Sequence, residues 1–263
     1  MPTPLPDTVL YEKHNRVAVI TINRPERRNA MTPEMRAGIQ AAFRDFNDDS
    51  GLWVAIFTGS GDRAFCAGAD LGQTIPQWTA DPEARLRDAV PDPTQRHFHY
   101  IHKPIIGAVN GIATAGGLEM LLGTDLRIAA EHASFGLGEV KWGLVPIGGS
   151  HVRLPRQIPW AVAMEILLTG EPIDARRAYD IGLINKVVPG HQLMDEAFAL
   201  ADRLCRNGPF AMRAAKESAV RSLVHEPAFA QDFYLAGRVF KSEDAVEGPR
   251  AFMEKREPRF TGR

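Results

Sequence analysis

The chain has 263 residues, 44% of them hydrophobic, which suits one or two globular domains with a substantial core. Its 31 basic and 32 acidic side chains give a formal net charge of −1, so neither a nucleic-acid partner nor an acidic tail is favoured. The two cysteines, Cys66 and Cys205, lack the spacing of a disulfide framework or a zinc site.

Residues 1–11 contain three prolines and one aspartate, but no basic region followed by an apolar one. We therefore expect an unprocessed, cytoplasmic protein in a reducing compartment. The most apolar stretch, residues 104–122, contains Asn110, Glu119 and four glycines, which make it a poor membrane span. A carboxylate within so apolar a stretch is a candidate functional group.

The first elements follow clear local signals. Residues 9–13 and 17–23 alternate and are rich in β-branched side chains, which predicts a hairpin. Thr32 followed by Pro33 is typical of a helix start. The helix that follows carries its apolar residues on one face, namely Met35, Ile39, Ala42, Phe43 and Phe46.

Short apolar strands at 52–58, 105–109 and 126–129 are separated by helical or irregular stretches, a rhythm that predicts an α/β fold with buried strands. After Val188 the pattern changes to four helices, at about 193–205, 209–224, 227–240 and 242–255. We expect a core over residues 1–192 and a helical segment over 193–263. Its aromatic residues must pack on the core or on another subunit: Phe229, Phe233, Tyr234, Phe240 and Phe252.

Residues 73–95 contain four prolines and little periodicity. Such a stretch is typical of a binding loop or lid, and plain surface disorder is an equally good interpretation.

The loop of residues 61–71 leaves a strand and includes four consecutive small residues from Cys66 to Ala69. Small side chains let the backbone approach a ligand closely, as an N–H group must in order to stabilise a developing oxyanion. An ordinary turn is the alternative. The loop lacks the glycine spacing of a dinucleotide-binding fingerprint.

Residues 110–120 predict a helix that begins near Gly116. The unpaired N–H groups at a helix N-terminus form a natural oxyanion site. Glu119 lies in the first turn among apolar neighbours, where its pKa should rise and suit acid/base chemistry. The alternative is that Glu119 merely complements the helix dipole.

Glu139 follows Glu119 by 20 positions, with one βα step between them. Such a step can bring both carboxylates to the same sheet edge, where two glutamates around one water could act as base and acid. A surface ion pair between Glu139 and Lys141 would explain Glu139 without catalysis.

Other candidates are weaker. His97, His99 and His102 cluster in sequence, but no carboxylate or cysteine completes a metal set, so we expect no metal site. Cys66 has no base partner placed by the sequence. Ser150 lacks the second glycine of a nucleophile elbow.

Taken together, these segments resemble the enoyl-CoA hydratase/isomerase (crotonase) family. The resemblance covers almost the whole chain, through residues 23–31, 66–71, 110–125, 139–144, 154–156, 168–170, 243–248 and 252–256. It implies a spiral of ββα units followed by a helical C-terminal trimerisation segment over 193–263. It also implies a homotrimer or a hexamer built as a dimer of trimers, with no nucleic-acid or membrane partner.

The resemblance further implies a site for an acyl-CoA thioester, with coenzyme A as part of the substrate and no tightly bound cofactor. The thioester oxygen would lie between the N–H groups of Ala69 and Gly116. Glu119 would activate water for addition at C3, and Glu139 would supply the proton at C2. Coenzyme A would contact Arg27 or Arg28, the backbone of Ala67, Gly68, Asp70 and Leu71, and Phe252 with Lys255 from a neighbouring subunit.

The implied activity is that of an enoyl-CoA hydratase, a carbon–oxygen lyase. Ala115 and Ser150 stand where glycine is common in the family. We expect Ala115 to narrow the turn slightly and to spare the oxyanion site, whereas Ser150 bears on the shape of the acyl pocket. The alternatives are isomerisation, carnitinyl-CoA-type dehydration or thioester hydrolysis on the same fold. A non-catalytic acyl-CoA-binding or RNA-associated scaffold is a further, less favoured alternative.

Overall fold

The computed structural model describes residues 5–73, 94 and 96–262. Its larger sheet has six strands, and only the β1–β2 pair is antiparallel. In spatial order the strands are β1 (Val9–His14), β2 (Val17–Ile22), β3 (Val54–Gly59), β5 (Ile105–Val109), β7 (Leu126–Ala130) and β10 (Lys186–Val188). The predicted hairpin and the predicted buried strands are confirmed, and the structure shows that the buried strands pair in parallel.

A second sheet of four short strands runs beside the first. In spatial order it consists of β4 (Ala64–Cys66), β6 (Ile112–Thr114), β8 (Ser134–Gly136) and β9 (Ile173–Asp174). Each of β3, β5 and β7 is followed along the chain by one short strand of this second sheet. The repeated passage from long strand to short strand confirms the α/β class and the expected spiral of ββ units with intervening helices.

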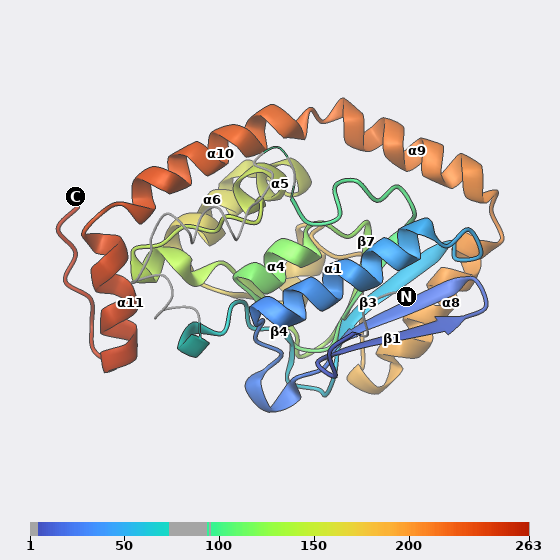
Figure 1. Cartoon of the computed structure of the whole chain (residues 1–263), viewed down its shortest axis with the longest axis horizontal. Coiled ribbons are helices and arrows are strands. Elements are labelled where there is room, and N and C mark those ends of the chain that lie inside the picture. Colours follow the sequence, from blue (N-terminus) through green and yellow to red (C-terminus); the bar gives the residue numbers. More distant parts are fainter. Residues whose placement is uncertain (1–4, 74–93, 95, 263) are drawn as a thin grey trace.

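Helices cover both faces of the larger sheet. Because successive side chains along a strand point to opposite faces, each strand packs against both helix layers. On β2, Ala18 and Ile20 face the layer that contains α1 (Pro33–Asp48), whereas Val17 and Val19 face α8 (Leu193–Cys205). Figure 1 shows these two helices flanking the strands. Burial on both faces explains why β2 reads as a nearly continuous apolar run.

The start of α1 is as the sequence predicts. Thr32 caps the helix by accepting a hydrogen bond from the N–H of Met35, and Pro33 occupies the first turn. The apolar face is buried in the main core, where Phe43 packs edge-on against Phe57. Its buried residues include all five predicted ones: Met35, Ile39, Ala42, Phe43 and Phe46.

The remaining helices lie between the strands or after the last of them. They are η1 (Pro25–Arg27), α4 (Gly116–Leu121), η2 (Gly138–Trp142), α5 (Ser150–Gln157), α6 (Trp160–Thr169), α7 (Ala175–Asp180), η3 (Gly190–Gln192), α9 (Pro209–Ser222), α10 (His225–Phe240) and α11 (Asp244–Glu254). Figure 1 shows α9 and α10 arching over one side of the molecule, with α11 at one end. The four helices predicted after Val188 are confirmed.

The C-terminal aromatics divide between the core and the surface. Phe229 of α10 is 0% exposed, and the guanidinium groups of Arg96 and Arg153 lie 5.4 and 5.3 Å from its ring. Tyr234 on the same helix is 65% exposed. Helix α10 therefore docks on this chain's own core through one edge and presents another edge to solvent.

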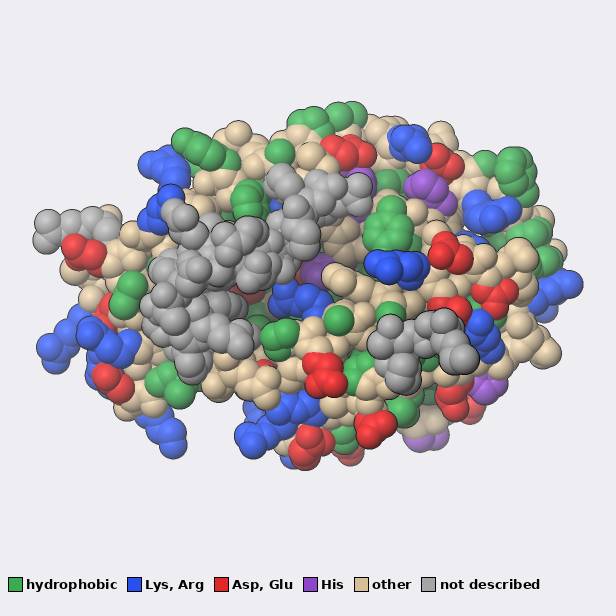
Figure 2. Space-filling view, in the orientation of Figure 1, with side chains coloured by type: hydrophobic (Ala, Val, Ile, Leu, Met, Phe, Trp, Pro, Cys, Tyr) green, Lys and Arg blue, Asp and Glu red, His purple; other side chains and the backbone are tan. Residues whose placement is uncertain are grey.

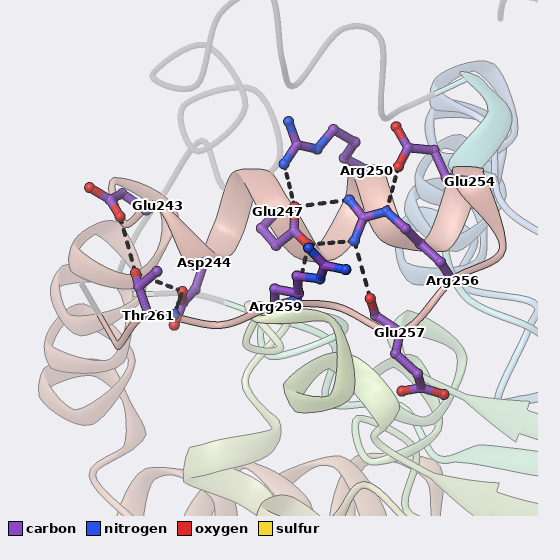
Figure 3. Close-up of polar contacts among 9 residues, drawn as sticks. All are labelled: Glu243, Asp244, Glu247, Arg250, Glu254, Arg256, Glu257, Arg259 and Thr261. Carbon is purple, nitrogen blue, oxygen red and sulfur yellow. Dashed lines mark hydrogen bonds and ion pairs between the residues drawn. The ribbon is translucent and has the colours of Figure 1, made fainter.

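The C-terminal tail is pinned to α11 by polar contacts (Figure 3). Glu247 accepts hydrogen bonds from the Arg256 side chain at 2.6 Å and from the Arg259 N–H at 2.9 Å. Asp244 accepts one from the N–H of Thr261 at 2.6 Å. The side chains of Arg256 and Arg250 and the N–H of Arg259 hold the pKa of Glu247 well below its usual range.

No helix in the described part of the chain is long and apolar enough to cross a membrane. The predicted excursion over residues 73–95 falls almost entirely outside the described residues.

Candidate active site

Two loops meet where β4 and α4 approach each other. A Cβ on Gly68, which has a φ of +88°, would lie 2.8 Å from the Cβ of Ala115, so this position requires glycine. The N–H of Met31 donates to the carbonyl of Gly68, and the N–H of Asp70 donates to the carbonyl of Met31. This bridge leaves the Ala69 N–H on the side of the loop away from Met31.

Neither the Ala69 N–H nor the Gly116 N–H donates a hydrogen bond within the described residues. Gly116 is the first residue of α4, where backbone donors have no partner inside the helix. A Cβ on Gly116 would lie 3.9 Å from the Cα of Gly68, so the two loops are in close contact. The segments that were predicted to form an oxyanion site are therefore adjacent in the structure.

Ala115, the residue before α4, has a φ of 51° and a ψ of −129°, a conformation that favours glycine. Such backbone strain costs about 1–3 kcal/mol per residue. The residue is held in place by its N–H, which donates to the carbonyl of Gly136, and by its carbonyl, which accepts from the Glu119 N–H. The departure from glycine at this position thus strains the loop without preventing it from forming.

Replacing Gly117 with alanine should force the two loops apart. The new Cβ would lie 2.2 Å from the carbonyl oxygen of Cys66, which is backbone and cannot move aside cheaply. We expect Gly117→Ala to lower the free energy of unfolding by about 1–3 kcal/mol, measured by urea denaturation. Gly208→Ala is the matched control because its Cβ would meet only Ala211, at 3.8 Å. Equal stability of the two variants would contradict the close packing.

Glu119 is buried on α4, with only 4% of the residue exposed. Its Oε1 accepts hydrogen bonds from the Gly148 N–H at 2.7 Å, the Ser150 N–H at 3.3 Å and the Ser150 hydroxyl at 2.9 Å. Burial raises the pKa of Glu119 above its ordinary value, and the Ser150 hydrogen bonds partly oppose this rise. The raised pKa predicted for this carboxyl group is present, but the carboxyl group meets polar partners rather than the apolar surroundings expected from its neighbours in sequence.

Glu139 lies on η2, just after β8, and its Oε2 is buried without a hydrogen-bond partner among the described residues. Burial, and next the charge of Glu119, raise the pKa of Glu139 to about 8. The alternative interpretation as a surface ion pair with Lys141 is wrong, because Lys141 pairs with Glu171 at 2.7 Å. Lys141 faces solvent, whereas the Glu139 carboxyl group turns inward.

Two further polar residues lie close to Glu119. A Cβ placed on Gly148 would be 2.7 Å from Glu119 Oε2 and 2.8 Å from His97 Nε2, so the Glu119 and His97 side chains both pack against Gly148. Burial, and next the charge of Arg153, lower the pKa of His97 to about 3, so its ring is neutral. Burial also lowers the pKa of Arg36 on α1, and the charge of Glu119 opposes that shift.

The sequence does not indicate that His97 and Arg36 lie near Glu119. In the space-filling view, basic and histidine side chains gather in a hollow near the middle of one face (Figure 2). The sequence marks His97 only as a possible metal ligand, and Arg36 has no local signal beyond its place one turn after Thr32.

A buried pair links α10 to the same region. His151 Nδ1 and Asp232 Oδ1 lie 2.7 Å apart, although they are 81 positions apart in sequence. Burial alone would lower the pKa of His151, but the hydrogen bond and charge of Asp232 outweigh it and raise the pKa. No sequence motif marks this contact.

The three clustered histidines turn to different partners. His99 contacts Glu226 at 3.0 Å, and His102 contacts Glu217 at 3.5 Å. Within the residues that the structure describes, no group of three or more His, Cys, Asp or Glu side chains is placed to hold a metal ion.

The candidate coenzyme A residues occupy several places. Asp70 is paired with Arg24 at 2.6 Å, so the Cys66–Leu71 loop is tied to the N-terminal region by an arginine that was not predicted. Arg27 and Arg28 are exposed, and Arg28 borders a cavity of about 510 Å³ together with Arg63 and His132. On α11, Phe252 packs edge-on against Trp142 of the same chain, and Lys255 is exposed.

The fold and the site together define a class of protein: a spiral ββα chain with two backbone donors and two glutamates, Glu119 buried and Glu139 half-buried, in one region. A family model described as enoyl-CoA hydratase/isomerase matches residues 12–263. The chain belongs to the enoyl-CoA hydratase/isomerase family, and its fold is the crotonase fold of its structural neighbours.

Two curated relatives are similar over nearly their whole length. The chain is 41% identical to an enoyl-CoA hydratase of Mycobacterium tuberculosis, covering 97% of this chain and 96% of that one. It is 39% identical to the (E)-benzylidenesuccinyl-CoA hydratase of Thauera aromatica, covering 97% and 99%. A solved carnitinyl-CoA hydratase from Mycobacterium avium superimposes with a TM-score of 0.88 at 38% identity, covering 98% and 100%.

Proposed function

We propose that this protein is an enoyl-CoA hydratase, which reversibly adds water to a 2-enoyl-CoA thioester to give a 3-hydroxyacyl-CoA. The observation that carries the proposal is the pair of glutamates with raised pKa values, Glu119 and Glu139, in the same part of the fold as two N–H groups that donate no hydrogen bond within the described residues. The relatives named as hydratases and dehydratases support it.

The backbone donors would act on the thioester. With its carbonyl oxygen between the N–H groups of Ala69 and Gly116, electron density is drawn from the conjugated double bond and C3 becomes electrophilic. When water adds at C3, the negative charge that develops on the carbonyl oxygen is stabilised by the same donors. Removing one such donor typically costs about 2.7–4 kcal/mol of transition-state stabilisation.

The two glutamates would divide the proton transfers. Glu119 accepts a proton from the water whose oxygen bonds to C3. Its Oε1 is held by three donors, whereas its Oε2 accepts no hydrogen bond from the residues that the structure describes. Glu139, whose pKa of about 8 keeps it protonated at neutral pH, donates its proton to C2. Exchange with solvent then restores both protonation states.

Coenzyme A is proposed to bind only as part of the substrate, with no tightly held cofactor. Ala67, Gly68 and Leu71 lie in the same loop as Ala69, so their backbone groups are close enough to contact the thioester end of coenzyme A. Arg27 or Arg28 would meet the phosphates. Phe252 and Lys255 are proposed to contact the nucleotide part of coenzyme A bound to a neighbouring subunit, in a homotrimer or hexamer. Sedimentation analysis would test this oligomeric state.

The pH profile of kcat/KM should be bell-shaped. The proton donor must be protonated, so activity falls as pH rises through about 8, the pKa of Glu139. The base must be ionised, so activity also falls on the acid side, at a pH above the ordinary glutamate range because burial raises the pKa of Glu119. The two apparent values belong to the pair, and initial rates from pH 4 to 10 measure them. A flat alkaline limb would contradict the role of Glu139.

A second candidate reaction is hydration or dehydration of an acyl group that carries a polar or charged substituent. Arg36 and neutral His97 near Glu119 favour a polar or anionic substituent. Relatives named carnitinyl-CoA dehydratase, at 37–39% identity, support dehydration as the direction of the reaction. Mass analysis of products from a panel of acyl-CoA thioesters in ¹⁸O-labelled water tests both candidates. Label at C3 of the product supports water addition, whereas release of free coenzyme A or a shifted double bond contradicts it.

A further inference from the structure

The hydroxyl group of Ser150 contacts the carboxyl group of Glu119. Ser150 is the first residue of α5 and is 0% exposed, and its hydroxyl donates to Glu119 Oε1 at 2.9 Å. The residue before it, Gly149, has a φ of +99°, a value that glycine adopts readily. This turn aims the N–H groups of Gly148 and Ser150 at the same carboxylate oxygen, at 2.7 and 3.3 Å.

The hydroxyl does not serve as an ordinary helix cap. Helix α5 has no side-chain cap hydrogen bond, and Gly149 occupies the cap position. A hydroxyl group in so buried a place needs a partner, and the partner found here is the candidate base. An alanine at this position would keep the backbone N–H group and remove only the hydroxyl donor.

We propose that Ser150 is a positioning residue that, with the Gly148 N–H, fixes Oε1 of Glu119 and leaves Oε2 as the oxygen that meets the reacting water. This proposal rests on the proposed hydratase function. Three donors on one oxygen restrict rotation of the carboxyl group, and a base held in a reactive orientation avoids the cost of reorienting in the transition state.

The same hydrogen bond favours the ionised form of Glu119, because a hydroxyl donor stabilises a carboxylate. Loss of the hydroxyl therefore raises the pKa of Glu119 and moves the acidic limb of kcat/KM to higher pH. The charged and titratable groups around this carboxyl group come from five elements or segments: Arg36 of α1, His97 before β5, Glu139 of η2, His151 and Arg153 of α5, and Asp232 of α10. Ser150→Ala changes none of these groups, so their effect on the pKa of Glu119 is the same in the variant and in the wild type.

The test compares Ser150→Ala with Ser150→Thr, which retains a hydroxyl donor. With crotonyl-CoA as substrate, we expect Ser150→Ala to lower kcat about tenfold at neutral pH, to leave KM nearly unchanged and to shift the acidic limb upward. We expect Ser150→Thr to recover most of kcat and the wild-type limb. An unshifted limb in Ser150→Ala, or equal loss in both variants at unchanged melting temperature, would overturn the proposal.

A second readout does not depend on turnover. Glutamate labelled with ¹³C at the carboxyl carbon reports the titration of Glu119, whose signal is the one that is lost in Glu119→Gln. A higher midpoint in Ser150→Ala than in wild type supports the proposal, and an identical midpoint overturns it. If the wild-type protein binds crotonyl-CoA without converting it, the proposed function fails, and this titration alone decides whether Ser150 controls Glu119.

Discussion

Glu139→Gln should remove nearly all turnover while leaving acyl-CoA affinity intact. The amide has almost the same shape as the carboxyl group, but it cannot deliver a proton to C2. General acid catalysis by a positioned group typically increases the rate about 10²–10⁴-fold, so we expect kcat to decrease by a factor in that range. Steady-state rates with crotonyl-CoA give kcat, and calorimetric titration with a saturated acyl-CoA gives the affinity.

The matched control is Glu131→Gln, which makes the same chemical change at an exposed glutamate. Its kcat should equal that of the wild type. Substantial activity in Glu139→Gln would contradict the two-carboxylate mechanism, and loss of acyl-CoA binding together with kcat would show that the variant is damaged more widely.

Glu119→Gln should have a similarly large effect for a different reason. The glutamine Oε1 can accept the same three hydrogen bonds from Gly148 and Ser150, so the fold around it is preserved. An NH₂ group then replaces Oε2, and an amide is not a base. We expect kcat to fall by about 10²–10⁴-fold, with little change in melting temperature.

Removing the charge of Glu119 should also alter its partner. The pKa of Glu139 is raised first by burial and next by the charge of Glu119, so in Glu119→Gln it should fall, yet stay above the ordinary glutamate value. Carboxyl ¹³C spectra measure this directly. An unchanged pKa would contradict the electrostatic contact between the two groups.

The variant that carries both substitutions should be no slower than either single variant, because residues that act as one unit show strongly non-additive effects. A multiplicative loss in the double variant would indicate that the two glutamates act independently.

Local signals allowed much of the fold to be predicted. The Thr32–Pro33 helix start, the hairpin and the buried strands depend on side chains close in sequence, and all are confirmed. The helix beginning at Gly116 follows from its small residues and from the apolar run after it. These elements carry the two loops that meet at the candidate site.

The contacts around Glu119 could not be predicted in the same way. Ser150 is 31 positions from Glu119, and Asp232 is 81 positions from His151, so chain folding rather than local pattern brings them together. The sequence presents Ser150 as a departure from glycine and as a poor candidate nucleophile, and its hydroxyl acquires a partner only when α5 packs beside α4. The Glu139–Lys141 alternative failed because neighbours along a short helix can face opposite environments.

The most direct test of the two-glutamate mechanism follows the absorbance of the conjugated enoyl thioester when the purified protein meets crotonyl-CoA. The account predicts rapid loss with the wild type, formation of 3-hydroxybutyryl-CoA, and almost no loss with Glu119→Gln or Glu139→Gln. Equal rates in the wild type and both variants, or no hydration of crotonyl-CoA or of any polar enoyl-CoA despite tight binding, would contradict it.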